Sequence, residues 1–361
     1  MKDQEEYNLQ RIAFNLITSP HQKARREALK KNIGARALPT LSQTELAILG
    51  FPEAAITDIK HNYMKLAEAE VHKAGINQIA IVFKEDDYFP PLLNQIFDPP
   101  EYIYVKGNKE SLKTEKIAVV GSRQATNYGW ACLNSILPDL CTAHVAIVSG
   151  MAYGIDSMAH QIAIKENGYT IGVNAGGLLH LYPSGNRGLI NRIFEKGCVI
   201  SEFGLDTVPR PFYFPIRNRI IAGISKAILI VEAAMKSGSL ITARLGLEQN
   251  RDIFAIPGRI DSPVSQGTNY LIQQGAKLIT CAADILIEYG IVLEKNQQEI
   301  ELQFSGNEKK VLELMADFDI KSVDFMVDRL EESVSATISL LMGLVLKGVV
   351  REESGGYRRI K

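Results

Sequence analysis

The chain has 361 residues, of which 46% are apolar and 22% are charged, and its formal net charge is −1. These values predict a globular protein of two or three domains, with no overall charge that would attract nucleic acid. The sequence contains no apolar run of about 18 residues, and its start, MKDQEEYNLQ, lacks the basic-then-apolar order of a signal peptide. We therefore expect no membrane segment and a cytoplasmic location.

Residues 1–75 are predicted to form a helical domain of the SAM or helix-hairpin-helix type. Apolar residues recur every three or four positions in residues 9–17 and 46–59. The segment QKARREALKKN at residues 22–32 is basic, but the GxG signature of a helix-hairpin-helix is absent. Both a solvated amphipathic helix and a DNA contact stay open for this segment.

Residues 76–290 are predicted to form a doubly wound, mostly parallel α/β sheet. A short apolar run at residues 79–83 comes first, and two proline pairs then force extended chain into a strand at residues 102–105. From Ile117 to Thr280, short β-branched runs alternate with helical patterns. This alternation is typical of parallel strands joined by crossover helices.

The C-terminal part of the chain is predicted to be a linker at residues 291–305 and a winged-helix-like domain at residues 306–361. Three helical patterns there precede two short strands around a Gly-Gly turn. The stretch VDFMVDRLEESVSATIS is acidic, where a DNA-reading helix would be basic. A protein-contact or regulatory role is therefore favoured over duplex binding.

Glycine and small polar residues follow the predicted strands of the sheet. The motifs are GSR at 121–123, SGMAYGID at 149–156, NAGG at 174–177, SEF at 201–203, SGS at 237–239 and PGR at 257–259. In an open parallel sheet the ligand crevice lies outside the carboxyl ends of the strands. We expect these turns to line one crevice, with main-chain N–H groups and serine hydroxyls as donors.

The segment FPIRNRIIAG at residues 214–223 indicates the ligand. It places Arg217 and Arg219 at a predicted helix start, where free N–H groups and guanidinium groups bind phosphate without a metal. Residues 205–260 contain eight Lys or Arg against four acidic residues, although the whole chain is near neutral. The pattern predicts a polyanion, and Phe214 either stacks a base or plugs the helix start.

Catalytic, metal and cofactor sites are not predicted. Asp156 and His160 lie four apart on a predicted helix, but helix-dipole and hydrogen-bonding roles explain them better than acid–base catalysis. Glu202 and Glu232 are expected to brace the arginines. The four cysteines have no CxxC spacing, and neither a G-x-G-x-x-G turn nor a phosphate-binding G-x-x-x-x-G-K-[ST] loop is present.

The ordered motifs GSR, SGMAYGIDSMAH, LYPSGNRGLI, SEF, FPIRNRIIAGIS, VEAAMKSGSLITA, RDIFAIPG and GTNYLIQQGA resemble the bacterial DNA-processing protein A family, DprA or Smf. The resemblance implies an extended Rossmann-like core that binds single-stranded DNA without catalysis and protects it during natural transformation. It also implies loading of a RecA-type recombinase, with a homodimer as the expected assembly. The implied DNA-binding residues, with Phe214 for stacking, are Gly121, Ser122, Arg123, Ser149, Gly150, Phe214, Arg217, Asn218, Arg219, Ser237, Gly238, Ser239 and Thr242.

Two other functions stay open at this point. A nucleotide-hydrolysing enzyme with a Rossmann-like fold is one, although NAGGLLH matches the PGGxGT loop of such enzymes poorly. The second is a winged-helix regulator of duplex DNA whose sheet domain acts as a sensor. Nucleotide turnover would favour the first, and duplex binding by residues 306–361 would favour the second.

Overall fold

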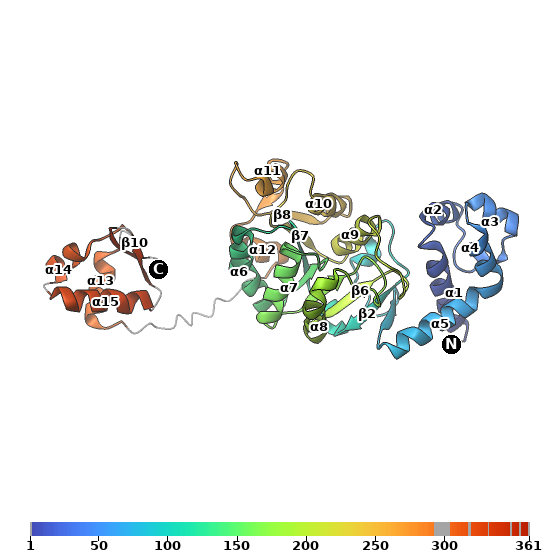
Figure 1. The fold of residues 1–361 in the computed structure, drawn as a ribbon, viewed down its shortest axis with the longest axis horizontal. Helices are drawn as coiled ribbons and strands as arrows, with labels where there is room; N and C mark the ends of the chain where they lie inside the picture. The colour runs from blue at the N-terminus through green and yellow to red at the C-terminus, as the bar shows by residue number, and fades with distance from the viewer. Residues whose placement is uncertain are drawn as a thin grey trace. The chain divides into compact units, whose positions relative to one another are not determined.

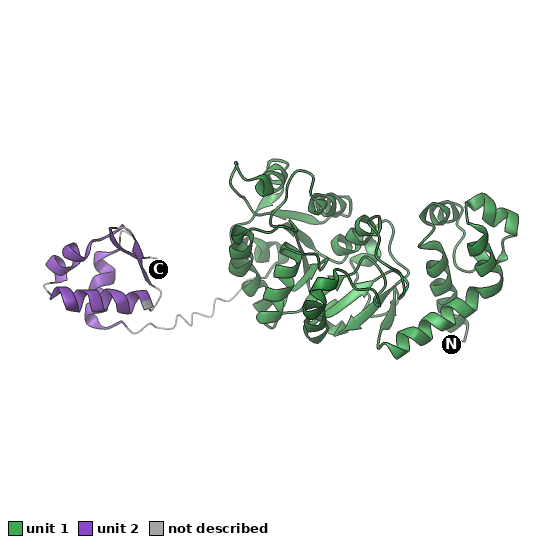
Figure 2. Cartoon of the chain, viewed as in Figure 1, with its two compact units in different colours: residues 1–292 green, residues 293–361 purple. Residues whose placement is uncertain are grey.

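The computed structural model describes residues 2–291, 304–316, 319–330, 332–346, 349–353 and 355–359. The chain divides into two compact units, residues 1–292 and residues 293–361 (Figure 2). The predicted linker at 291–305 lies largely outside the described residues. The division into domains at 1–75, 76–290 and 306–361 stays a prediction.

The first unit begins with helices and continues as alternating strands and helices (Figure 1). Its helices are α1 (Lys2–Thr18), α2 (Gln22–Lys30), α3 (Gln43–Leu49), α4 (Glu53–Thr57), α5 (Tyr63–Ile76), α6 (Asn127–Thr142), α7 (Ile155–Lys165), α8 (Arg187–Lys196), α9 (Tyr213–Gly223), α10 (Gly238–Glu248), α11 (Gln266–Gln273) and α12 (Ala282–Leu286). Its strands are β1 (Ala80–Phe83), β2 (Tyr102–Gly107), β3 (Lys116–Val120), β4 (Ala146–Ser149), β5 (Thr170–Val173), β6 (Cys198–Ser201), β7 (Ala227–Ile230), β8 (Asp252–Ala255) and β9 (Lys277–Leu278).

The nine strands form one mixed sheet in the order β1-β2-β6-β5-β4-β3-β7-β8-β9. Strands β3 to β9 pair in parallel, whereas β2 pairs antiparallel with both β1 and β6. From β3 the chain moves outward through β4, β5 and β6 and then returns to β7 on the other side of β3. The order therefore reverses between β3 and β7, where open α/β sheets bind their ligands.

Helices cover both faces of the sheet because its strands are apolar on both sides. All residues of β3, β4, β5, β6 and β7 are buried. Ile200 packs in the cluster that holds Ile220 and Ile221 of α9, whereas its neighbour Val199 packs with Ile190 and Ile193 of α8. Successive residues of a strand point to opposite faces, so these two clusters lie on opposite faces of the sheet. The predicted doubly wound, mostly parallel sheet is confirmed.

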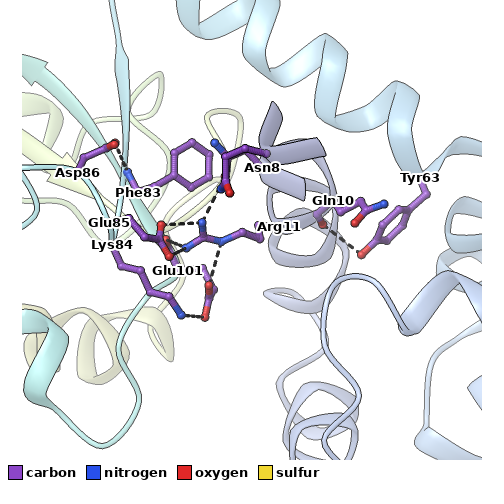
Figure 3. A network of polar contacts seen from close by, with 10 residues as sticks. Asn8, Gln10, Arg11, Tyr63, Phe83, Lys84, Glu85, Asp86 and Glu101 are labelled. Carbon is purple, nitrogen blue, oxygen red and sulfur yellow. Dashed lines mark hydrogen bonds and ion pairs between the residues drawn. The ribbon is translucent and has the colours of Figure 1, made fainter. Parts of the chain in front are cut away.

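The N-terminal helices pack onto the sheet through a buried arginine. Arg11 of α1 is 1% exposed, and its guanidinium donates to Glu101 Oε2 at 2.9 Å and to Glu85 Oε2 at 2.8 Å (Figure 3). It also lies over the ring of Phe83, 4.9 Å from the centroid. The guanidinium group is planar and always charged, so it can donate two parallel hydrogen bonds to a carboxylate in such a partly buried position. The helices and the sheet are therefore joined by directional contacts as well as by apolar packing.

The second unit contains helices α13 (Gly306–Leu314), α14 (Val323–Leu330) and α15 (Val334–Leu346) and the antiparallel strands β10 (Val350–Glu353) and β11 (Gly356–Arg359). Its core includes Val311, Met326, Leu341 and Tyr357. The order of elements is the predicted one, and the assignment as a winged helix stays a prediction. Within the described residues of both units, no helix is long and apolar enough to cross a membrane.

Candidate nucleic-acid interface

A pocket with a volume of about 400 Å³ opens at the carboxyl ends of β3 and β7, where the strand order reverses. Three segments supply most of its wall: the turn after β3, the first half of α9 and the start of α10. The lining residues are Val120, Gly121, Ser122, Arg123, Ala152, Asp156, Phe214, Pro215, Arg217, Asn218, Ile221, Ala234, Lys236, Ser237, Gly238, Ser239, Ile241 and Thr242.

The turn after β3 holds Arg123 at the rim of the pocket. Ser122 N–H donates to the Glu232 carbonyl at 2.7 Å, and the Ser122 carbonyl accepts from Ile155 N–H at 3.1 Å. Gly154 has φ +76°, and a Cβ there would lie 2.3 Å from the Ser122 carbonyl oxygen. Only glycine combines this left-handed backbone with so close an approach. The turn is therefore fixed by its neighbours, while the Arg123 side chain itself is exposed.

The start of α10 forms the opposite wall. Ser237 caps this helix, since its Oγ accepts from Ser239 N–H at 3.3 Å and lies 2.7 Å from Ser239 Oγ. Thr242 is buried one turn further along, and Lys236 is exposed just before the cap. The first N–H groups of a helix have no intrahelical partner, and the helix dipole favours negative charge there. With Lys236 beside it, this wall suits a phosphate.

Arg217 forms the floor of the pocket and is 5% exposed. Its Nη1 donates to the Gly150 carbonyl at 2.8 Å and to the Val173 carbonyl, and its Nε donates to Asn218 Oδ1 at 3.0 Å. A Cβ on Gly150 would lie 2.7 Å from the guanidinium nitrogens, so a larger residue there would displace the guanidinium from its carbonyl partners. Burial lowers the pKa of Arg217 to about 10, with Arg123 adding to the shift and Asp156 opposing it. The side chain remains charged at neutral pH.

Asp156 is a buried acidic residue whose charge acts favourably on Arg217. Its Oδ2 accepts from Gly150 N–H at 3.1 Å and from Ala152 N–H at 3.3 Å, and the side chain is buried. Burial raises the pKa of Asp156, while Arg217 and these N–H donors act against that shift. The carboxylate thus orients the turn after β4 and compensates the buried guanidinium.

His160 does not pair with Asp156, although the two lie on one helix. Its Nδ1 lies 2.6 Å from Thr170 Oγ1, and the ring is fully buried. Burial lowers the pKa of His160 to about 3. At neutral pH the imidazole is uncharged and inside the core. The hydrogen bond that was expected between His160 and Asp156 is therefore wrong, and His160 has Thr170 as its partner instead.

The burial of His160 predicts how the stability of the fold changes with pH. Acidification from pH 7 to pH 5 should lower the free energy of unfolding by about 2 kcal/mol through this residue. The unfolded chain binds a proton near pH 6.5, whereas the folded protein does so only near pH 3, so stability present above 6.5 is lost as the pH falls. Urea unfolding of wild type and His160→Gln at both pH values measures the difference. An equal loss in both proteins would contradict this assignment.

The aromatic residues at the start of α9 take different positions. Phe214 is half-buried and lines the pocket, with the guanidinium groups of Arg123 and Arg217 each 5.7 Å from its ring centroid. Tyr182 meets the same ring edge-on at 5.6 Å. Tyr213 is 3% exposed and packs against Phe203, so it cannot stack on a base. Phe214 is the aromatic group that a ligand in the pocket would reach.

Three candidate residues do not line the pocket: Ser149, Gly150 and Arg219. Arg219 pairs with Glu202, and its Nε lies 3.8 Å from Asp98 Oδ2. Ser149 is fully buried at the end of β4, where its Oγ donates to the Val119 carbonyl at 2.7 Å. Glu202 braces an arginine as predicted. Glu232 does not, because its carboxylate accepts from Thr126, the residue that caps α6.

The structure therefore brings most of the predicted set together. Ten of the thirteen candidates line the pocket, and Gly150 lies directly behind its floor. Lys236 lines the pocket but was not among the predicted binding residues, because a lysine in a turn is usually only exposed to solvent. The NAGG and SEF turns contribute no lining residue, and PGR lies at a separate pocket with Tyr128 and Glu232. One crevice lined by all six turns is thus not what the structure shows.

Comparisons with known proteins agree with this fold. Residues 80–290 match the family described as DNA recombination-mediator protein A. The chain belongs to this family. It is 37% identical to Protein Smf of Escherichia coli over 292 residues, which cover 77% of this chain and 76% of that protein. The recombination-mediator match spans the whole sheet and the pocket.

Two solved structures of the family resemble this one. The X-ray structure of DNA processing protein A from Streptococcus pneumoniae superposes with a TM-score of 0.62 at 35% identity, covering 79% of this chain and 96% of that chain. A structure of DNA processing protein A from Helicobacter pylori, described by its single-stranded DNA binding mode, gives a TM-score of 0.54 at 30% identity. That match covers 59% of this chain and 95% of that chain. The sequence resemblance to the DNA-processing protein A family is confirmed.

Proposed function

We propose that this protein binds single-stranded DNA in the pocket between β3 and β7 and does not change it chemically. The observation that carries the proposal is that Arg123, Lys236 and the N-terminus of α10 line one pocket with the half-buried ring of Phe214. Cationic side chains and the N–H groups at a helix start bind phosphate, and an aromatic ring face stacks on a base. The Helicobacter pylori relative, described by its single-stranded DNA binding mode, supports the same ligand class.

The arrangement accounts for binding with little sequence preference. Every nucleotide offers a phosphate and a π-face, and the pocket walls supply hydroxyl, amide and guanidinium donors. Phe214 stacks one base, while Arg123 on one wall and Lys236 on the other contact phosphates on either side. Arg217 and Asp156 hold the floor and the turns in place. A duplex would bury its bases in the stack and lose the contact with Phe214.

The role of the bound strand is proposed from the family. Its description as a recombination mediator supports delivery of the strand to a RecA-type recombinase, with protection of incoming DNA in natural transformation as the setting. A homodimer is the proposed assembly. Strand exchange by a recombinase, started on strands pre-coated with this protein, measures delivery directly. Faster exchange is expected, and an unchanged rate would remove the delivery step while leaving strand binding untouched.

Fluorescence anisotropy with a labelled oligo-dT strand tests the proposed function. The expected result is binding that weakens steeply with salt and that duplex of equal length competes for poorly. Nucleoside monophosphates incubated with the same protein should remain intact, since Asp156 is held by main-chain N–H groups and His160 lies against Thr170 and not against Asp156. Equal affinity for duplex and single strand, or steady nucleotide hydrolysis, would contradict the proposal.

A further inference from the structure

A second concentration of positive charge lies on the N-terminal helices. Residues 21–36 contain six Lys or Arg and one acidic residue, a local net charge of +5, which is denser than the basic stretch around the pocket. Lys23, Arg26 and Lys30 lie at spacings of three and four, hence on one face of α2, and Lys31 follows directly. All four side chains are exposed. We call these four residues the α2 basic surface.

Helix stability accounts for only part of this surface, namely Lys30 and Lys31 at the end of α2. Lys23 and Arg25 stand in the first turn of α2, which carries no acidic residue and no side-chain cap. Positive charge at a helix start opposes the dipole and is unfavourable, in contrast to Lys30 and Lys31 at the other end. Lys30 pairs with Glu27 at 2.8 Å, and Lys31 and Lys23 also lower the pKa of that glutamate. Lys23, Arg26 and Lys31 make no ion pair within residues 2–291.

Hydrogen bonds and one ion pair connect helix α2 to helix α9, which forms part of the pocket wall. Arg25 on the same helix donates to Asn15 Oδ1 at 3.0 Å, and Asn15 Nδ2 donates to the Glu202 carbonyl at 2.7 Å. The Glu202 carboxylate pairs with Arg219, which follows the pocket residue Asn218. Ala24 and Ala28 bury the opposite face of α2 in the core. The surface is therefore held on the same body as the pocket and is not a loose tail.

We propose that the α2 basic surface binds the phosphates of a single strand that continues beyond the pocket. This inference rests on the proposed function, because the occupant is the same strand. Four exposed cations complement a polyanion, and long strands would gain contacts that short strands do not reach. The surface offers no exposed ring for stacking among its four residues, so it adds affinity through phosphate alone and not through base recognition.

Anisotropy of the full chain with oligo-dT of about 10 and about 40 nucleotides tests this inference. The variant is Lys23→Ala, Arg26→Ala, Lys31→Ala. The control is Lys65→Ala, Lys165→Ala, Lys309→Ala, which removes the same charge from exposed positions on α5, α7 and α13. We expect the variant to lose roughly tenfold in affinity for the long strand, with a salt slope reduced by about 2, and to bind the short strand as wild type does.

The outcomes separate the two proposals. Wild-type binding of the short strand together with an unchanged long-strand affinity in the variant would overturn the α2 basic surface and leave the pocket intact. Absence of short-strand binding by wild type would overturn the pocket itself. A variant that loses duplex affinity but keeps long single strands would show that the surface serves duplex DNA, which also contradicts the inference. Equal thermal unfolding of variant and control establishes that both are folded.

Discussion

Removal of the two exposed cations at the pocket, by Arg123→Ala and Lys236→Ala together, should lower the affinity for single-stranded DNA by about 2–4 kcal/mol. Each charge sits on a different wall, and both side chains are exposed. Their loss removes attraction for two phosphates, and the slope of log affinity against log salt should flatten by about 1.4, at 0.7 per phosphate of a single strand. Anisotropy with oligo-dT across a salt series gives both values.

The matched control for this variant is Lys165→Ala with Arg244→Ala. It removes one lysine and one arginine whose side chains are 73% and 71% exposed and whose ion pairs with Glu166 and Glu248 lie at the surface. The control should bind within about 0.5 kcal/mol of wild type, since exposed ion pairs contribute little. An equal loss of affinity in both variants would mean that the strand responds only to total charge and not to the pocket.

Truncation of Arg217 should destabilise the fold itself, by about 3–5 kcal/mol in the free energy of unfolding for Arg217→Ala. The change leaves the buried Asp156 carboxylate without its cation and takes the donor away from the carbonyls of Gly150 and Val173. Arg217→Lys keeps the charge but not the fork, so an intermediate loss is expected. Urea unfolding of the three proteins measures these differences.

A double variant distinguishes electrostatic compensation between Asp156 and Arg217 from simple loss of packing. Asp156→Ala with Arg217→Ala should cost less than the sum of the two single changes, because neither charge is then left unpaired. Coupling of about 1–3 kcal/mol is expected for residues in one network. Additive losses would show that Asp156 and Arg217 act independently, and the floor of the pocket would then need another explanation.

Much of the fold follows from local patterns in the sequence. The β-branched runs at Ile117, Ile147 and Ile228 became buried parallel strands because both faces of such a sheet are covered by helices. Ligands of open parallel sheets bind outside the carboxyl ends of the strands, and on this basis the GSR and SGS turns were predicted to form a binding site. Both turns line the pocket. The reversal of strand order between β3 and β7 could not be predicted, because strand order depends on contacts between residues that are distant in the sequence.

The positions of Arg217 and Arg219 in the FPIRNR segment differ from the prediction that both lie at a helix start. Residues two apart on a helix point to nearly opposite sides, so Arg217 and Arg219 cannot both face one pocket. α9 begins at Tyr213, which places both arginines beyond the first turn and its free N–H groups. Arg217 instead grips carbonyls at the strand ends, and Arg219 turns toward Glu202. The helical repeat alone would have separated their roles.

The central claim, that a single strand occupies the pocket between β3 and β7, is tested most directly by photocrosslinking. An oligonucleotide of bromodeoxyuridine, irradiated in complex with the full chain and digested, reports the contacted peptides by mass spectrometry. We expect adducts on the peptide that contains Phe214, because this ring is the aromatic group in the pocket wall. The Arg123→Ala, Lys236→Ala variant should lose those adducts. Adducts confined to other surfaces, with none at Phe214, would contradict it.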